Sequence, residues 1–167
     1  FRRGAGQATV RLPARPPPHT ALTLTIRFAF PLQPALSGLY LSTWNGSDGA
    51  ARRLAATQFE ANAARAAVPC WDEPARKAVW RVTLVAERGL TVLSNMPAAG
   101  EPAERGGGRG GDGAPPRVAT LHAPTPPMSS YLLAAVVGRL DSATVELPEP
   151  GEGVVWPAAP PGAGGAP

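Results

Sequence analysis

Apolar residues recur at every second position in several parts of the chain, a spacing typical of strands with one buried face. The clearest run is at residues 21–30, where five large apolar side chains alternate with smaller or polar ones: Leu22, Leu24, Ile26, Phe28 and Phe30. The same alternation is present at residues 78–86. Three shorter runs of branched or aromatic residues, bounded by Gly, Pro or Asn, lie at residues 90–97, 117–123 and 129–138.

The helical signal is weak by comparison. Only residues 49–67 are rich in helix-favouring residues, and Pro69 ends that run because proline lacks the backbone N–H that a helix interior needs. Five or more short strands with little helix are typical of an antiparallel sheet or sandwich. The pattern therefore predicts an all-β fold, an antiparallel β-sandwich.

Three segments rich in Pro or Gly divide the chain. Residues 12–20 contain three successive prolines, which predict a rigid extended connector. Residues 98–116 are dominated by glycine and are expected to form a flexible surface loop. Residues 148–167 lack apolar periodicity and are expected to be a disordered tail. A length of 167 residues favours one domain, which we expect at residues 1–147.

Composition narrows the class of protein. The net charge of +4 is modest and spread along the chain, so no nucleic-acid partner is indicated. The longest apolar run, residues 131–138, is far shorter than the roughly 20 residues of a membrane-spanning helix. The single cysteine, Cys70, excludes an internal disulfide framework and favours a reducing, cytoplasmic compartment. The chain begins at Phe1 rather than Met, which we interpret as a cut end.

Side chains suited to catalysis are sparse. His19 and His122 are far apart in sequence, so no pair of imidazoles has the four-residue spacing of a zinc-hydrolase helix. Cys70 has no histidine close in sequence to serve as its base, and we expect a buried, structural cysteine. The chain alone is therefore expected to bind no metal and to catalyse no reaction.

Gln58 and Glu60 are the candidate binding residues. In an extended segment they point to the same side, because alternate side chains share a face. A carboxylate and an amide on one face could receive an ammonium group, with Glu60 accepting its hydrogen bonds. In the alternative interpretation, Glu60 pairs with Arg65 or Arg53 on a solvated face.

Four blocks of the sequence, in this order and spacing, resemble the N-terminal domain of zinc aminopeptidases of the aminopeptidase N and puromycin-sensitive type: SGLYLSTW, ATQFEANAARAAVPCWDEPARKAVW, LSNMP and TPPMSSYLLAAVVG. The resemblance extends over about residues 22–140. It implies a saddle-like β-sandwich that packs against a thermolysin-like catalytic domain. It also implies a zinc enzyme that removes N-terminal residues from peptides.

Under this resemblance, Gln58 and Glu60 match the family's Gln-x-Glu pair. The glutamate of that pair helps to bind the free α-amino group of the substrate, and the glutamine lines the pocket for the first side chain. The peptide N-terminus and the catalytic domain are the expected partners. The family's zinc ligands and general base lie in segments that this sequence does not contain, so the resemblance implies a fragment that contributes only recognition.

The acidic turn VPCWDEP is expected to be architectural. Asp72 and Glu73 are adjacent and diverge in direction, which argues against a pair of carboxylates for acid–base catalysis. We expect Asp72 to pair locally with Arg65 or Arg76.

Several large side chains are expected in the core. Trp44, Trp71 and Trp80 stand where the family more commonly has Phe or Tyr, which would keep an aromatic core of altered volume. Met128 and Tyr131 are expected to pack inside as well.

Two other functions stay open at this point. A stand-alone β-sandwich could bind peptides or proteins without any enzymatic activity. The segment ERGGGRGGDG could be an RNA-binding segment of the Arg-Gly type, but Glu104 and Asp112 offset its arginines and it has no aromatic residue for stacking.

Overall fold

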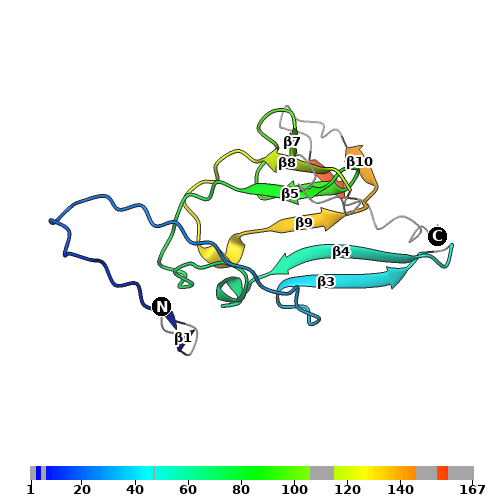
Figure 1. Ribbon diagram of the computed structural model, residues 1–167. Helices are drawn as coiled ribbons and strands as arrows, with labels where there is room; N and C mark the ends of the chain where they lie inside the picture. Colours follow the sequence, from blue (N-terminus) through cyan, green and yellow to red (C-terminus); the bar gives the residue numbers. More distant parts are fainter. Residues whose placement is uncertain (1–2, 5–6, 47, 106–114, 146–153, 158–167) are drawn as a thin grey trace. The chain divides into compact units, whose positions relative to one another are not determined.

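The computed structural model describes residues 3–4, 7–46, 48–105, 115–145 and 154–157. Its secondary structure consists of short strands and two single turns of 3-10 helix, which confirms the all-β prediction (Figure 1). The chain divides into two compact units, Phe1–Pro31 and Leu32–Pro167. The larger unit contains both of the main sheets, and all strand pairs in them are antiparallel.

The larger sheet has four strands in the order β3-β4-β9-β6. Its strands are β3 (Gly38–Asn45), β4 (Ala51–Gln58), β9 (Ala135–Gly138) and β6 (Thr91–Ser94). Strands β3 and β4 form a hairpin in continuous register from Gly38 opposite Gln58 to Asn45 opposite Ala51. Gly49 has φ +75° in the hairpin turn, a conformation that glycine adopts without a steric penalty.

The smaller sheet has three strands in the order β5-β8-β7. These are β5 (Thr83–Glu87), β8 (Arg117–Leu121) and β7 (Ala103–Arg105). Beyond the ends of β5 and β8, the two segments are joined only by isolated contacts. The amide of His122 donates to the carbonyl of Val82 at 2.9 Å, and Ala78 forms a bridge with Met128. The strand predicted at residues 78–86 is therefore regular only in its second half.

Two further strand pairs are short. One joins β1 (Arg3–Gly4) to β2 (Gln7–Ala8), and the other joins β10 (Ser142–Val145) to β11 (Val154–Pro157). Strand β11 falls within the expected tail, whose other residues lie outside the described ones. Likewise, β7 falls within the expected loop at residues 98–116, of which residues 106–114 lie outside the described part. Among the described residues, no helix is long and apolar enough to cross a membrane.

The strand predicted at residues 21–30 does not form, and this prediction was wrong. The segment has no strand assignment, and its apolar side chains are exposed, with Leu22 60% and Phe28 52% accessible. A strand needs a neighbouring backbone for its ladder of hydrogen bonds. Within the described part of the chain, no backbone hydrogen bond reaches residues 21–30, so the alternating pattern has no sheet to join.

The helix-favouring stretch at residues 49–67 forms no α-helix. Residues 51–58 are strand β4, and only the 3-10 turn η1 (Ala64–Ala66) is helical. Helix propensity is a weak preference, and β4 gains hydrogen-bonded partners on both sides from β3 and β9.

The core of the described residues is small. Its buried apolar side chains are mostly alanine, and Phe59 is the large one: Ala56, Phe59, Ala64, Ala67, Ala86 and Ala119. Buried polar residues are as numerous: Asp72, Thr120, His122, Thr125, Ser129 and Ser130. With so little apolar area buried, polar contacts inside the fold must hold many of its segments in place.

None of the large side chains expected in the core is fully buried. Trp71 is 77% exposed, and the other four are only half-buried: Trp44, Trp80, Met128 and Tyr131. The turn η2 (Ser130–Leu132) instead directs the small hydroxyl of Ser130 inward, where it has a hydrogen-bond partner. A buried hydroxyl is tolerated when it is hydrogen-bonded.

We predict that Phe59→Ala lowers the free energy of unfolding by about 3–5 kcal/mol, because it opens a cavity in place of the one large apolar side chain that is buried among the described residues. Phe28→Ala is the matched control, since Phe28 is 52% exposed, and it should have a much smaller effect. Chemical denaturation of both variants measures the difference. Equal losses would contradict the placement of these two rings.

Candidate functional site

Gln58 and Glu60 lie at the end of strand β4. Gln58 is its last residue, and both side chains are exposed, whereas Phe59 between them is 3% exposed. Burial thus alternates through the three residues, as expected for an extended segment with one face inward. The buried ring of Phe59 holds the segment in place, and the side chains of Gln58 and Glu60 stay accessible.

The alternative partners of Glu60 are not engaged with it. Arg65 pairs with Asp72, and no ion pair between Glu60 and Arg53 is present among the described residues. The carboxylate is therefore available to a group from outside the described part of the chain. The peptide bond from Glu60 to Ala61 is cis.

The loop after Glu60 turns back immediately. The amide of Ala63 donates to the carbonyl of Phe59 at 2.8 Å, and η1 follows. The amide of Arg65 then donates to a carboxylate oxygen of Asp72 at 3.0 Å. This short, internally bonded loop connects the candidate binding residues to a buried acid.

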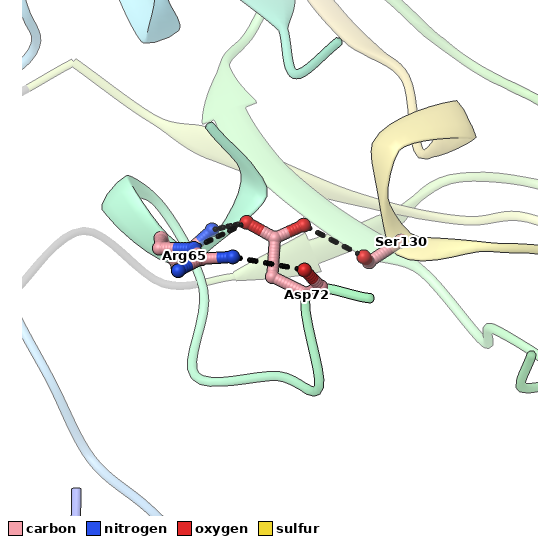
Figure 2. A network of polar contacts seen from close by, with 3 residues as sticks. All are labelled: Arg65, Asp72 and Ser130. Carbon is pink, nitrogen blue, oxygen red and sulfur yellow. Dashed lines mark hydrogen bonds and ion pairs between the residues drawn. The ribbon is translucent and has the colours of Figure 1, made fainter. Parts of the chain in front are cut away.

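Asp72 is bonded through both of its carboxylate oxygens (Figure 2). Oδ2 accepts from the backbone N and from Nε of Arg65, at 3.0 and 2.9 Å, and Oδ1 accepts from the hydroxyl of Ser130 at 2.9 Å. The Arg65 guanidinium also donates to the main-chain carbonyl of Asp72 at 2.9 Å. We call these three residues the Asp72 junction. The expected local pairing with Arg65 is confirmed, whereas Arg76 lies 3.9 Å from Glu73 on the surface.

The electrostatics of the junction favour an ionised acid. Burial pushes the pKa of Asp72 upward. Hydrogen bonds from the side chain and backbone of Arg65 and from Ser130, together with the charge of Arg65, outweigh burial and hold the pKa below its usual value of 3.8. The Asp72 side chain is only 3% exposed and is shielded from water, whereas the side chain of Arg65 is 44% exposed and keeps contact with solvent.

Residues 129–135 collect contacts from several other segments. The Ser129 hydroxyl donates to the carbonyl of Pro74 at 2.6 Å, next to the junction. Farther along the segment, the amide side chain of Asn95 donates to the carbonyl of Leu132 at 2.7 Å and accepts from the amide of Ala134 at 2.8 Å. We call this stretch the 129–135 segment.

Strand β4 reaches the 129–135 segment through a side chain. The ladder between β4 and β9 ends at Ala56 opposite Val136. At the next position, the amide of Ala135 donates to the hydroxyl of Thr57 at 3.0 Å. Thr57 thereby extends the attachment of β4 to the residue directly before Gln58.

These contacts were not expected from the sequence. Asn95 directly follows β6, a position where polar side chains often replace backbone partners, but Thr57 lies in a stretch whose composition favoured a helix and carried no such signal. Their partners are 78 and 39 positions away, so local patterns could not identify them.

Cys70 and the histidines supply no catalytic arrangement. Cys70 is half-buried, and burial, followed by the charge of Asp72, raises the pKa of its thiol. His122 is buried, with Nδ1 2.8 Å from the carbonyl oxygen of Met96. Within the described ranges, no group of three or more His, Cys, Asp or Glu could hold a metal ion.

Comparison with known proteins identifies the family. The profile of the Peptidase M1 N-terminal domain matches residues 2–132, and the chain belongs to this family. It is 39% identical over 133 residues to a puromycin-sensitive aminopeptidase of Caenorhabditis elegans, covering 80% of this chain and 13% of that protein. It is 34% identical over 138 residues to aminopeptidase N of Acetobacter pasteurianus, covering 83% of this chain and 36% of that protein.

A mammalian relative is similar at a higher identity over a shorter stretch. The chain is 43% identical over 110 residues to aminopeptidase Q of Mus musculus, covering 66% of this chain and 19% of that protein. The chain thus spans 13–36% of the length of these three relatives. The resemblance inferred from the four sequence blocks is confirmed.

We predict that Asp72→Asn destabilises the fold by roughly 1–3 kcal/mol at neutral pH, because it removes a charge that accepts three hydrogen bonds, one of them buried and two partly buried. The folded-state pKa of Asp72 is lowered, so its contribution is complete above the usual value of 3.8 and is lost as the pH falls through the folded-state pKa. Denaturation of both proteins across pH should show a constant difference from about pH 5 to 8 that shrinks below about pH 4.

Asp48→Asn is the matched control. Asp48 is exposed at the hairpin turn, where it pairs with Arg52 at 2.8 Å, and exposed pairs contribute little to stability. An equal loss of stability in both variants, or no loss in Asp72→Asn at neutral pH, would contradict the role assigned to the buried acid.

Proposed function

We propose that this chain is the N-terminal substrate-recognition part of a zinc metalloaminopeptidase that removes N-terminal residues from peptides. The observation that carries the proposal is the exposed pair Gln58 and Glu60, presented at the end of β4 above the buried ring of Phe59. The family relationship supports it, because the relatives are aminopeptidases.

The chemistry of recognition follows from the side chains. The carboxylate of Glu60 accepts hydrogen bonds from the ammonium group of a peptide N-terminus, a charged contact that a blocked N-terminus cannot make. Gln58, which has both a donor and an acceptor, lines the pocket for the first side chain. A site built for a charged amine rejects substrates without one, because its own carboxylate would then be left unpaired.

The zinc ion is proposed to be bound elsewhere. Because the described residues contain no cluster suited to a metal, they do not fit a zinc site, and its ligands would come from a catalytic domain outside this chain. We propose that this domain is the principal partner. Two exposed apolar side chains close to the junction, Trp71 and Leu132, suit a contact with a neighbouring domain. The proposed recognition domain comprises residues 1–147.

In the full-length protein, Glu60→Ala should lower kcat/KM for free-amino peptides by about 5- to 150-fold. This corresponds to a loss of roughly 1–3 kcal/mol of transition-state stabilisation, the cost of losing a charged hydrogen bond. Steady-state kinetics with a chromogenic aminoacyl substrate measure it. Glu87→Ala is the control, since Glu87 is an exposed acid of the other sheet. Unchanged kinetics in Glu60→Ala would reject the assignment.

Gln58→Ala should act differently. Because Gln58 is proposed to face the first side chain rather than the amine, the substitution should change the ranking of substrates with different first residues. The expected change is about 3- to 10-fold between polar and apolar residues. A panel of aminoacyl substrates measures this ranking. A uniform loss on every substrate would argue against a role in specificity.

A further inference from the structure

We infer that the Asp72 junction positions Glu60 for recognition, so that Asp72 is a positioning residue for the binding pair. This inference rests on the proposed function. It concerns a group that does not touch the substrate and acts through the loop between Glu60 and Arg65.

The segment that carries the binding pair is attached at both ends to the same neighbour. Before Gln58, the hydroxyl of Thr57 accepts from the amide of Ala135 at 3.0 Å. After Glu60, the amide of Arg65 bonds to Asp72, whose other oxygen accepts from Ser130 at 2.9 Å. Ala135 and Ser130 both belong to the 129–135 segment. The binding pair therefore lies between two attachments, of which the second passes through Asp72.

The loop between the attachments is short and internally bonded, so a shift of Arg65 at one end also moves Glu60 at the other. Only four residues separate Glu60 from Arg65, and they are closed by the bond from Ala63 to Phe59 at 2.8 Å. Phe59 fixes the middle of the segment by burial. When the far end is released, Glu60 retains the attachment at Thr57 and Phe59 but gains freedom on its C-terminal side.

The 129–135 segment, to which the junction is bonded, is itself hydrogen-bonded to the end of strand β6 and the residue after it. The 129–135 segment is fixed by Asn95, which contacts both Leu132 and Ala134, and by the hydroxyl of Ser94, which donates to the carbonyl of Ala134 at 2.8 Å. The acid therefore connects the binding loop to a support tied to strand β6. A misplacement of about 1 Å in a binding group is enough to weaken its contact severalfold.

The first experiment reports on the loop without any reference to activity. In this chain, Asp72→Asn should raise amide hydrogen exchange at residues 61–67 by about tenfold or more, while the β3–β4 hairpin turn stays unchanged. Asp48→Asn should leave residues 61–67 unchanged. If Asp72→Asn fails to fold, Ser130→Ala removes a single bond of the junction and should act in the same direction to a smaller extent.

The second experiment is a double-mutant cycle in the full-length protein with a free-amino peptide substrate. Asp72→Asn alone should raise KM by about 3- to 10-fold with little change in kcat, because Glu60 binds a part of the substrate that does not react. In the Glu60→Ala background, the same substitution should change kcat/KM by less than about twofold, since the group that it positions is gone.

The outcomes separate the two proposals. Unchanged exchange at residues 61–67, or effects of Asp72→Asn and Glu60→Ala that simply add, would overturn the positioning role while leaving an effective Glu60 in place. If Glu60→Ala had no effect on kinetics, the proposed function would fail, and the positioning of Glu60 for recognition would fail with it. Raised exchange together with strong non-additivity supports the inference.

Discussion

A buried carboxylate must have partners, and at Asp72 this requirement joins three parts of the chain. An ionised acid removed from water is costly unless hydrogen bonds and an opposite charge compensate it. Arg65 and Ser130 provide both, through bonds of 2.9–3.0 Å to the two carboxylate oxygens. As a result, the loop after β4, the acidic turn and the turn before β9 are fixed relative to one another.

The small core explains why such a contact matters here. Buried apolar side chains of the described residues are mostly alanine, which contributes little area, and Phe59 is the exception. Hydrogen bonds from side chains to the backbone, rather than apolar packing, hold the loops at the ends of the strands in place. Thr57, Ser94 and Asn95 all bond to main-chain atoms of the 129–135 segment. The exposed Gln58 and Glu60 lie next to these hydrogen bonds.

Much of the local structure was predictable from the sequence. Branched runs bounded by Gly, Pro or Asn became β6 and β8, and the partner of Asp72 was one of two nearby arginines. The failures have a common physical cause. The strongest alternating pattern, at residues 21–30, forms no strand because alternation specifies a face and not a neighbour. The helix-favouring residues 51–58 became a strand because β3 and β9 supplied neighbours.

The proposed binding pair was recognisable as a motif, but the contacts that hold it were not. Alternation in an extended segment places Gln58 and Glu60 on one side, and the burial of Phe59 agrees with it. The attachments at Thr57 and Ser130 involve residues 78 and 58 positions away in sequence. Contacts at such separations depend on the sheet topology, which periodicity does not specify.

The most direct measurement is a crystal structure of the full-length protein with a peptide analogue that has a free amino terminus. We predict that the ammonium nitrogen lies within about 3.2 Å of a carboxylate oxygen of Glu60, with the bonds between Asp72 and Arg65 intact. An ammonium group bound away from Glu60, with this side chain directed into solvent, would contradict the proposed recognition.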